Sequence, residues 1–294
     1  MPRTLTFEAI GTHWQIDLLD CPPPAQEAAL LATIHERIEL FDQAYSRFRF
    51  DSLVTKMSQQ AGTYQLPPDA APLVNLYYNL YTITNNAFTP LIGQVLSDAG
   101  YDATYSLKSR ELHTPPRWED VIGYNPPYLT IKKPVLLDFG AAGKGYLVDL
   151  VSNIIQEYGI TSFCVDAGGD ILYTNKHDTT LRVGLEHPEN TSEVIGVAEL
   201  LNNSICGSAG NRRAWGNFHH IINPHTLTSP RAILATWVIA ENALLADALA
   251  TCLFFVPAST LLAHYTFKYV IMFPNHSVEI SPQFPGEIFT EKEK

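Results

Sequence analysis

The sequence predicts an α+β fold with largely antiparallel sheets and several long helices. Short strand-like segments follow one another in runs, and only a few long amphipathic segments interrupt them. The chain has 294 residues, which is enough to bury a large core, and it shows no internal repeat, linker or low-complexity segment. We therefore expect residues 1–294 to form a single domain.

Alternation, helical spacing and breaking residues divide the first half of the chain. The predicted elements are, in order, a strand at 10–19, a break at Pro22–Pro24, a helix at 25–41, a polar and aromatic loop at 46–58, a helix that Asp69 caps and that runs to Ile83, and long loops with one short helix at 93–127. Long loops in a compact domain often carry function, so the last of these segments is of interest.

The second half is predicted to be richer in strands. They are placed at 128–131, 135–138, 162–166, 170–174, 181–185, 194–200, 218–222, 232–239, 269–273 and 277–280. Helices are expected at 145–158, with Gly159 as its stop, at 242–255, and briefly after Pro257.

Composition narrows the class of protein. Charged residues make up 17% and hydrophobic residues 46% of the chain, which is typical of an ordered globular protein. The formal net charge of −11 argues against a general nucleic-acid surface, which needs clustered Lys and Arg. Any bound anion must therefore be held by local backbone amides, a lysine or a metal.

The cysteine pattern and the first residues of the chain help to predict the cellular compartment of the protein. Cys21, Cys164, Cys206 and Cys252 form no CxxC pair, and we expect buried free thiols, which fit a reducing compartment. The first residues lack an apolar signal region and a lipidated cysteine, and the apolar stretch 248–263 is shorter than a membrane span. We expect a cytoplasmic protein without a membrane span.

The segment 135–149 is the most informative part of the chain. An apolar run ends in Asp138, passes through three glycines and Lys144, and opens an amphipathic helix. Such a junction exposes backbone N–H groups and a positive helix end, which together suit a phosphate group. It matches neither the Walker pattern nor GxGxxG, so its meaning depends on the segments that accompany it.

A second informative pair lies far along the chain. Asp247 and Thr251 are four residues apart, so their oxygens share one face of a predicted helix. The residues around Asp247 are small or apolar, and a buried carboxylate is costly unless it is paired or bound to a metal. Carboxylate, hydroxyl and carbonyl oxygens suit Mg²⁺.

Three further segments leave alternatives open. Residues 166–170 could be a simple hairpin turn or a place where the backbone approaches a ligand. The arginines of 207–213 could meet phosphate, although a solvated face is the favoured interpretation. If 218–222 is a strand, His219 and His220 face opposite ways, which argues against a shared zinc and leaves one histidine able to act as a base from a cleft.

Taken together, these segments resemble the ApbE family, the FAD:protein FMN transferases. The resemblance is nearly end to end, and its most specific part is the ordered pair of blocks D-x-G-x-x-x-K-G-Y-x-x-D at 138–149 and A-D-A-x-A-T at 246–251. Further matching segments lie at 9–12, 45–52, 86–90, 165–170, 220–224 and 280–282. The resemblance implies a single ApbE-type, T-fold-like domain.

The resemblance also implies a reaction and a set of site residues. Family members bind FAD with Mg²⁺, break the pyrophosphate, and place FMN on a Thr or Ser hydroxyl of a partner flavoprotein, releasing AMP. By motif position, Ala141 (through its carbonyl), Asp247 and Thr251 would hold the metal, and His220 would be the catalytic base. The residues that would contact FAD are Ile10, Phe48, Ala87, Phe88, Thr89, Asp138, Lys144, His220 and Ile221.

The chain departs from the family pattern at several positions. Ile10 stands where Met is usual and Thr89 where Asp is usual, while Asn223 and Leu227 replace an Asp and a Gly after the histidine. Two alternatives to the transferase therefore stay open. One is an FAD pyrophosphatase that gives FMN and AMP with water as the acceptor, and the other is a non-catalytic flavin-binding protein.

Overall fold

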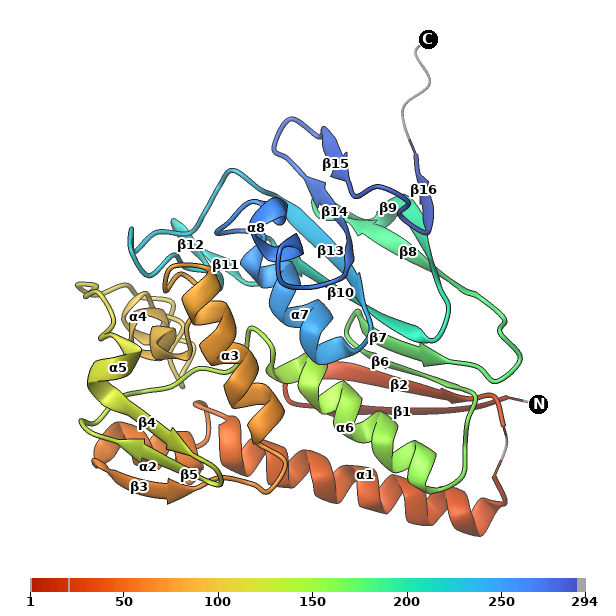
Figure 1. Ribbon diagram of the computed structural model, residues 1–294, viewed down its shortest axis with the longest axis horizontal. Helices are drawn as coiled ribbons and strands as arrows, with labels where there is room; N and C mark the ends of the chain where they lie inside the picture. Colours follow the sequence, from red (N-terminus) through yellow and green to blue (C-terminus); the bar gives the residue numbers. More distant parts are fainter. Residues whose placement is uncertain (1, 21, 290–294) are drawn as a thin grey trace.

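The computed structural model describes residues 2–20 and 22–289, and its centre is an eight-stranded sheet (Figure 1). Every neighbouring pair of strands in this sheet is antiparallel, so the predicted fold class is confirmed. In spatial order the strands are β1 (Arg3–Ala9), β2 (Thr12–Leu18), β6 (Phe163–Ala167), β7 (Asp170–Thr174), β10 (Asn203–Ala209), β13 (Ala235–Ala240), β14 (Lys268–Met272) and β15 (Val278–Ile280).

Helices cover one face of the sheet. Helix α6 (Gly143–Glu157) packs against β6 and β7, and α7 (Ala243–Cys252) packs against β10 and β13 (Figure 1). The two helices contact one another, and α1 (Pro24–Tyr45) packs along α6. Every residue of α7 is buried, because the helix has apolar residues all round and is enclosed by protein.

A smaller sheet covers part of the other face. It consists of β16 (Gly286–Ile288), β9 (Asn190–Leu200) and β8 (Leu181–His187), in that order. A second apolar cluster fills the space between the two sheets, with members such as Leu185 and Ile205. Residues of β8 and of β10 therefore line the same cavity, which is the candidate site described below.

The remaining elements lie mostly between α1 and α6 in the chain. They are α2 (Leu53–Gln59), β3 (Gly62–Gln65), α3 (Ala71–Ile83), the 3₁₀ helix η1 (Pro90–Ile92), α4 (Gly93–Asp98), α5 (Trp118–Val121), β4 (Ile122–Asn125) and β5 (Tyr128–Ile131), followed much later by β11 (Ala214–Trp215), β12 (Phe218–His219) and α8 (Ala258–Leu262).

Two predictions for the N-terminal region are wrong in detail. The strand predicted at 10–19 begins only at Thr12, because Ile10 and Gly11 both have positive φ and form the turn between β1 and β2. The loop predicted at 46–58 ends in helix α2, whose N-terminus is capped by Ser52 through a 3.1 Å bond from the Thr55 amide.

The predicted cap of α3 is also wrong. Asp69 does not cap the helix, whose N-cap residue is Ala70 and has no side-chain cap. The Asp69 carboxylate instead accepts a 2.6 Å bond from the Arg37 guanidinium on α1. Asp69 therefore ties two helices together.

Two strands predicted from apolar runs, at 135–138 and 218–222, differ from the observed structure. Residues 135–138 are extended but join no sheet, because the amides of Val135 and Asp138 donate to Met57 and Pro90 in loops and helices nearby. The strand predicted at 218–222 stops at His219. Conversely, β10 was not predicted, because its sequence of small and polar residues lacks the β-branched pattern of a strand.

The structure also bears on the expected free cysteines and on the expected lack of a membrane span. Cys206 and Cys252 are buried, Cys164 is partly buried, and none of these three is bonded to another, while Cys21 lies outside the described residues. Within the part of the chain that the structure describes, none of the helices has the length and apolar character needed to cross a bilayer.

Candidate active site

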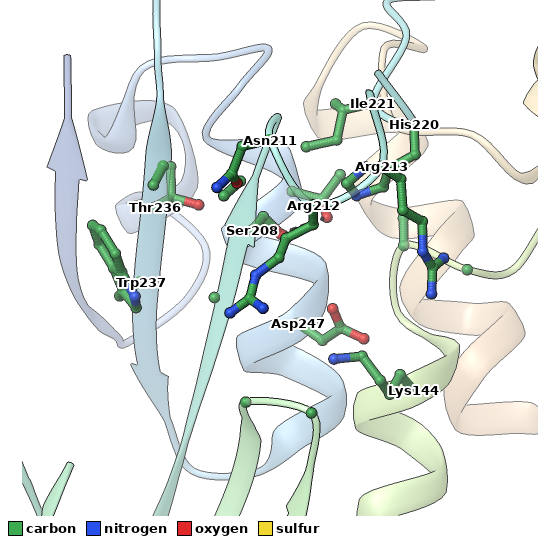
Figure 2. Close-up of a pocket in the computed structure, with 18 of the residues that line it drawn as sticks. Lys144, Ser208, Asn211, Arg212, Arg213, His220, Ile221, Thr236, Trp237 and Asp247 are labelled. Carbon is green, nitrogen blue, oxygen red and sulfur yellow. Dashed lines mark hydrogen bonds between the residues drawn. The ribbon is translucent and has the colours of Figure 1, made fainter. Parts of the chain in front are cut away.

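A cavity of about 550 Å³ opens between the N-terminal end of α6, the buried helix α7 and the neighbouring loops (Figure 2). This volume suits a small organic ligand or cofactor. Its lining draws on segments from the whole chain, including Thr12, Phe48, Ala87, Phe88, Thr89, Tyr101, Asp138, Ala141, Lys144, Gly168, Ser208, Arg212, Arg213, His220, Ile221, Trp237, Asp247 and Thr251.

Asp138 is held rigidly at the start of the glycine turn. Its carboxylate pairs with Arg47, whose side chain is only 2% exposed, and accepts a 2.7 Å bond from the Gly140 amide. The Arg47 guanidinium lies 4.2 Å from the centroid of the Phe48 ring and 4.8 Å from that of Tyr101, so two aromatic faces also hold it. This pairing neutralises the buried carboxylate and fixes one end of the cavity.

Lys144 reaches from α6 into the cavity. Its ammonium lies 2.5 Å from the buried Asp170 carboxylate and donates a 3.2 Å bond to the Ala167 carbonyl. Burial works to lower the pKa of Lys144, but the carboxylates of Asp170 and Asp247 outweigh it and raise that pKa. Lys144 is therefore a fixed positive charge, set to meet an anion that enters the cavity.

Asp247 projects from α7 toward Lys144, as Figure 2 shows. Its Oδ2 accepts a 2.9 Å bond from the Gly145 amide. Burial and the nearby Asp170 carboxylate raise the pKa of Asp247 to about 8, although Lys144 acts in the opposite direction. A carboxylate in this setting gains much from a cation that takes the place of its proton.

Two more oxygen-bearing residues, Thr251 and Ala141, line the cavity together with Asp247. Thr251 lies one helical turn further on, and its Oγ1 is 3.2 Å from the Ser208 Oγ of β10. The Ala141 carbonyl is free of the first turn of α6, because the Gly145 amide donates to Asp247 instead. A carboxylate, a hydroxyl and a backbone carbonyl are the oxygen ligands that Mg²⁺ prefers.

His220 lines the cavity and has one unpartnered ring nitrogen. Its Nδ1 is buried and has no hydrogen-bond partner among the described residues. Burial, and then the positive charge of Arg213, lower the pKa of His220 to about 3, so the ring is neutral at physiological pH.

His219 points elsewhere. Its Nε2 lies 3.0 Å from the Pro230 carbonyl, and its ring packs edge-on against Phe254. Burial lowers the pKa of His219 as well. The two adjacent histidines thus have different environments, one beside the cavity and one in a structural contact.

Two arginines stand at the mouth of the cavity. The Arg213 guanidinium donates a 2.8 Å bond to the Tyr101 hydroxyl, and Arg212 pairs with Glu186 at 2.9 Å. Both side chains are exposed and both line the cavity (Figure 2). The favoured interpretation of 207–213 as a solvated face is therefore incomplete.

The glycines of 166–170 form a hairpin turn that also borders the cavity. They form a two-residue hairpin between β6 and β7, in which Gly168 and Gly169 have φ of +63° and +95°. Both glycines also line the cavity. A Cβ on Gly168 would lie 2.0 Å from the Thr12 Oγ1, whereas Gly169 has open space and is favoured by its positive φ alone.

The structure brings eleven of the twelve predicted site residues to this cavity. They are Phe48, Ala87, Phe88, Thr89, Asp138, Ala141, Lys144, His220, Ile221, Asp247 and Thr251. The exception is Ile10, which is not among the residues that line the cavity. It lies in the turn between β1 and β2 and packs against the main apolar cluster. Arg47 and Asp170 lie in the matching segments 45–52 and 165–170, and Tyr101 lies in the predicted loops 93–127, but none of the three was predicted as a site residue, because their contacts join distant segments.

Comparison with known proteins gives matches over most of the chain. The profile of the ApbE family matches residues 10–269. An FAD:protein FMN transferase of Rhodobacter capsulatus is 25% identical over 265 residues, which cover 84% of this chain and 50% of that protein. One of Treponema pallidum is 24% identical over 277 residues, which cover 83% of this chain and 76% of that protein. The chain thus spans about half the length of the first relative.

Two solved structures share the fold. The ApbE protein of Thermotoga maritima superposes with a TM-score of 0.79 at 21% identity, over 96% of this chain and 97% of that one. The flavin transferase ApbE of Vibrio cholerae gives a TM-score of 0.78 at 18% identity, over 96% of each chain. At these identities the likeness establishes the architecture.

Proposed function

The chain belongs to the ApbE family, and from this premise we propose that it is a Mg²⁺-dependent FAD:protein FMN transferase. FAD is its substrate, the acceptor is a Thr or Ser hydroxyl of a partner flavoprotein, and AMP is the second product. One observation carries the proposal: the cavity joins the oxygen donors of Asp247, Thr251 and Ala141 to the cation Lys144 and to the neutral ring of His220.

The residues present fit a bound magnesium ion. Asp247 is buried beside other acids, so a divalent cation would relieve the cost of its charge. Asp247, Thr251 and the Ala141 carbonyl would hold the ion. When bound, Mg²⁺ neutralises charge on the pyrophosphate.

The protein's own groups then account for the transfer. Lys144 and the arginines at the mouth attract the pyrophosphate, and Asp138 with Arg47 positions one end of the dinucleotide. His220 accepts the proton of the acceptor hydroxyl as its oxygen attacks the flavin-side phosphorus, and the bond from that phosphorus to the AMP oxygen breaks. The negative pyrophosphate raises the pKa of His220 from its low value in the free protein, which makes the ring a better base.

The departures at Asn223 and Leu227 lie in a turn beside His220. The Asn223 Oδ1 accepts bonds from the amides of His225 and Thr226 at 2.9 and 3.3 Å, a role that either Asn or Asp performs. Leu227 has a φ of +56°, where glycine has no steric cost. Both departures thus change residues that form a turn, and neither removes a residue assigned to the site. The transferase therefore remains favoured over a non-catalytic flavin-binding protein.

A single assay separates the three candidate functions. The protein is incubated with FAD and Mg²⁺, with and without an acceptor flavoprotein, while AMP release and flavin fluorescence of the denatured acceptor are followed. A transferase gives AMP together with acceptor-bound flavin. AMP without an acceptor indicates a pyrophosphatase, and bound FAD without AMP indicates a flavin-binding protein.

A further inference from the structure

A histidine–glutamate–histidine cluster lies on the surface, apart from the residues assigned above. His187 is the last residue of β8, Glu189 lies in the turn that leads to β9, and His276 lies in the turn between β14 and β15. One ligand atom from each side chain lies within 4.8 Å of the other two. Among the described residues, this is the one group of three or more His, Cys, Asp and Glu side chains that meets this condition.

The three side chains already converge through their mutual contacts. His276 Nε2 lies 2.8 Å from Glu189 Oε2, and the Glu189 amide donates a 3.1 Å bond to His187 Nδ1. The two imidazole rings meet edge to face, with centroids 5.5 Å apart. His276 sits at a φ of +63°, so the second turn has a defined conformation that presents its side chain toward the first.

We propose that His187, Glu189 and His276 form a binding site for Zn²⁺ or a similar first-row divalent cation, with solvent at the fourth position. Two imidazoles and one carboxylate form a donor set that zinc favours and that Mg²⁺, which prefers oxygen ligands, does not. Tetrahedral coordination places ligand atoms about 3.3 Å apart, so small rotations of these largely exposed side chains complete the site. A metal bound through the Nε2 of His276 would replace the hydrogen bond between that nitrogen and Glu189.

The site has a structural consequence for the cavity. Pro188 stands between His187 and Glu189, lines the cavity, and accepts a hydrogen bond from the Asn211 side chain. A metal that joins the two turns would therefore fasten this part of the cavity wall to β14 and β15. This role is independent of the proposed transferase reaction and of the oxygen donors around Asp247.

The test is a calorimetric titration of the 294-residue chain with Zn²⁺ alone as the probe, in excess Mg²⁺ to saturate the proposed oxygen site. We expect one zinc site whose affinity falls on the order of tenfold or more in His187→Ala and in His276→Asn. Asn tolerates the positive φ at position 276, so the second variant keeps the turn. Thermal unfolding without zinc verifies that both variants fold as the wild type does.

The chain offers a matched control. His13 and Glu8 form an exposed pair of the same kind, 2.9 Å apart, and no third such ligand joins them among the described residues. His13→Ala should leave zinc binding unchanged. Zinc should also slow amide hydrogen exchange in residues 189–193 of the wild type but not of His276→Asn. Absence of zinc binding, or equal affinity in the wild type and His276→Asn, would overturn the proposal.

Discussion

The Gly145 amide donates a 2.9 Å hydrogen bond to the Asp247 carboxylate and thereby joins α6 to α7 at the floor of the cavity. The contact needs a residue without a side chain, since a Cβ at position 145 would lie 2.2 Å from the Ala243 carbonyl oxygen and 2.7 Å from the Asp247 Cβ. A second carboxylate strengthens the same junction: Asp149 of α6 accepts 2.8 Å bonds from the first two amides of α7, those of Ala243 and Leu244.

Gly145→Ala should therefore separate the two helices. We expect a loss of about 1–3 kcal/mol in the free energy of unfolding, the usual cost of overpacking, together with weaker Mg²⁺ binding. Gly143→Ala is the matched control, because a Cβ there meets its nearest atoms at 3.6 and 3.9 Å, which is ordinary contact. Chemical denaturation of both variants gives the comparison, and equal stability of the two would contradict this account of the junction.

Asp247→Asn should stabilise the protein in the absence of a divalent cation. The pKa of Asp247 is about 8 in the folded protein and about 4 in an unfolded chain, so between these values the folded state holds a proton that the unfolded state lacks. The contribution of Asp247 to the free energy of unfolding therefore declines as pH rises from about 4 to about 8. The variant removes this decline and keeps an oxygen for the Gly145 amide.

Thermal unfolding in EDTA between pH 5 and pH 9 measures this effect. The melting temperature of Asp247→Asn, relative to the wild type, should increase with pH and level off above pH 8. Added Mg²⁺ should then stabilise the wild type much more than the variant. If the difference in melting temperature between the variant and the wild type stays constant across the pH range, the pKa of Asp247 is not raised as inferred here.

Asp138→Ala and Lys144→Ala should each weaken FAD binding. The two side chains lie on either side of the glycine turn and form charged contacts, with Arg47 and Asp170 respectively, that fix them in the cavity. Loss of a hydrogen bond to a charged group costs about 1.5–3 kcal/mol, which corresponds to roughly 10- to 150-fold in the dissociation constant. Calorimetric titration with FAD measures it, and unchanged affinity in both variants would exclude this cavity as the FAD site.

Local sequence signals located the elements that carry the site. Periodicity and the stop at Gly159 placed α6 within two residues of its observed bounds, and the β7 prediction matches the observed strand. Strand β10 was not predicted, because its small residues lack a local strand pattern. Small residues are needed there for close packing against α7, where the Cys206 thiol lies 3.5 Å from the Ala243 carbonyl. Tertiary packing, which no short window of sequence contains, determines such a strand.

The residues that the sequence did not reveal act through distant partners. Arg47 pairs with Asp138, 91 positions away, and Asp170 of β7 pairs with Lys144 of α6. The members of each pair come from different segments of the chain, so only the fold shows that they meet. Ile10 shows the converse, since a position assigned by family resemblance lies in a turn outside the described lining of the cavity.

His220→Ala provides the most demanding test of the proposed mechanism. As a general base, His220 should contribute about 10²–10⁴-fold to the rate of transfer, with little effect on FAD affinity. His219→Ala is the control, because the His219 ring contacts the Pro230 carbonyl and Phe254. Single-turnover assays on FAD-loaded protein should show slow transfer in the first variant and a normal rate in the second.

The pH dependence should identify His220 as the base rather than as a packing residue. With a pKa of about 3 in the free protein, His220 stays unprotonated above about pH 4, so it gives kcat/KM no acidic limb at ordinary pH. Bound FAD brings negative charge next to the ring and raises its pKa, so kcat should fall at a higher pH than kcat/KM does as the solution becomes more acidic. His220→Ala should abolish this limb of kcat. If the limb survives in the variant, or if the variant and the wild type transfer FMN at the same rate, the base is another group and His220 serves only to shape the cavity.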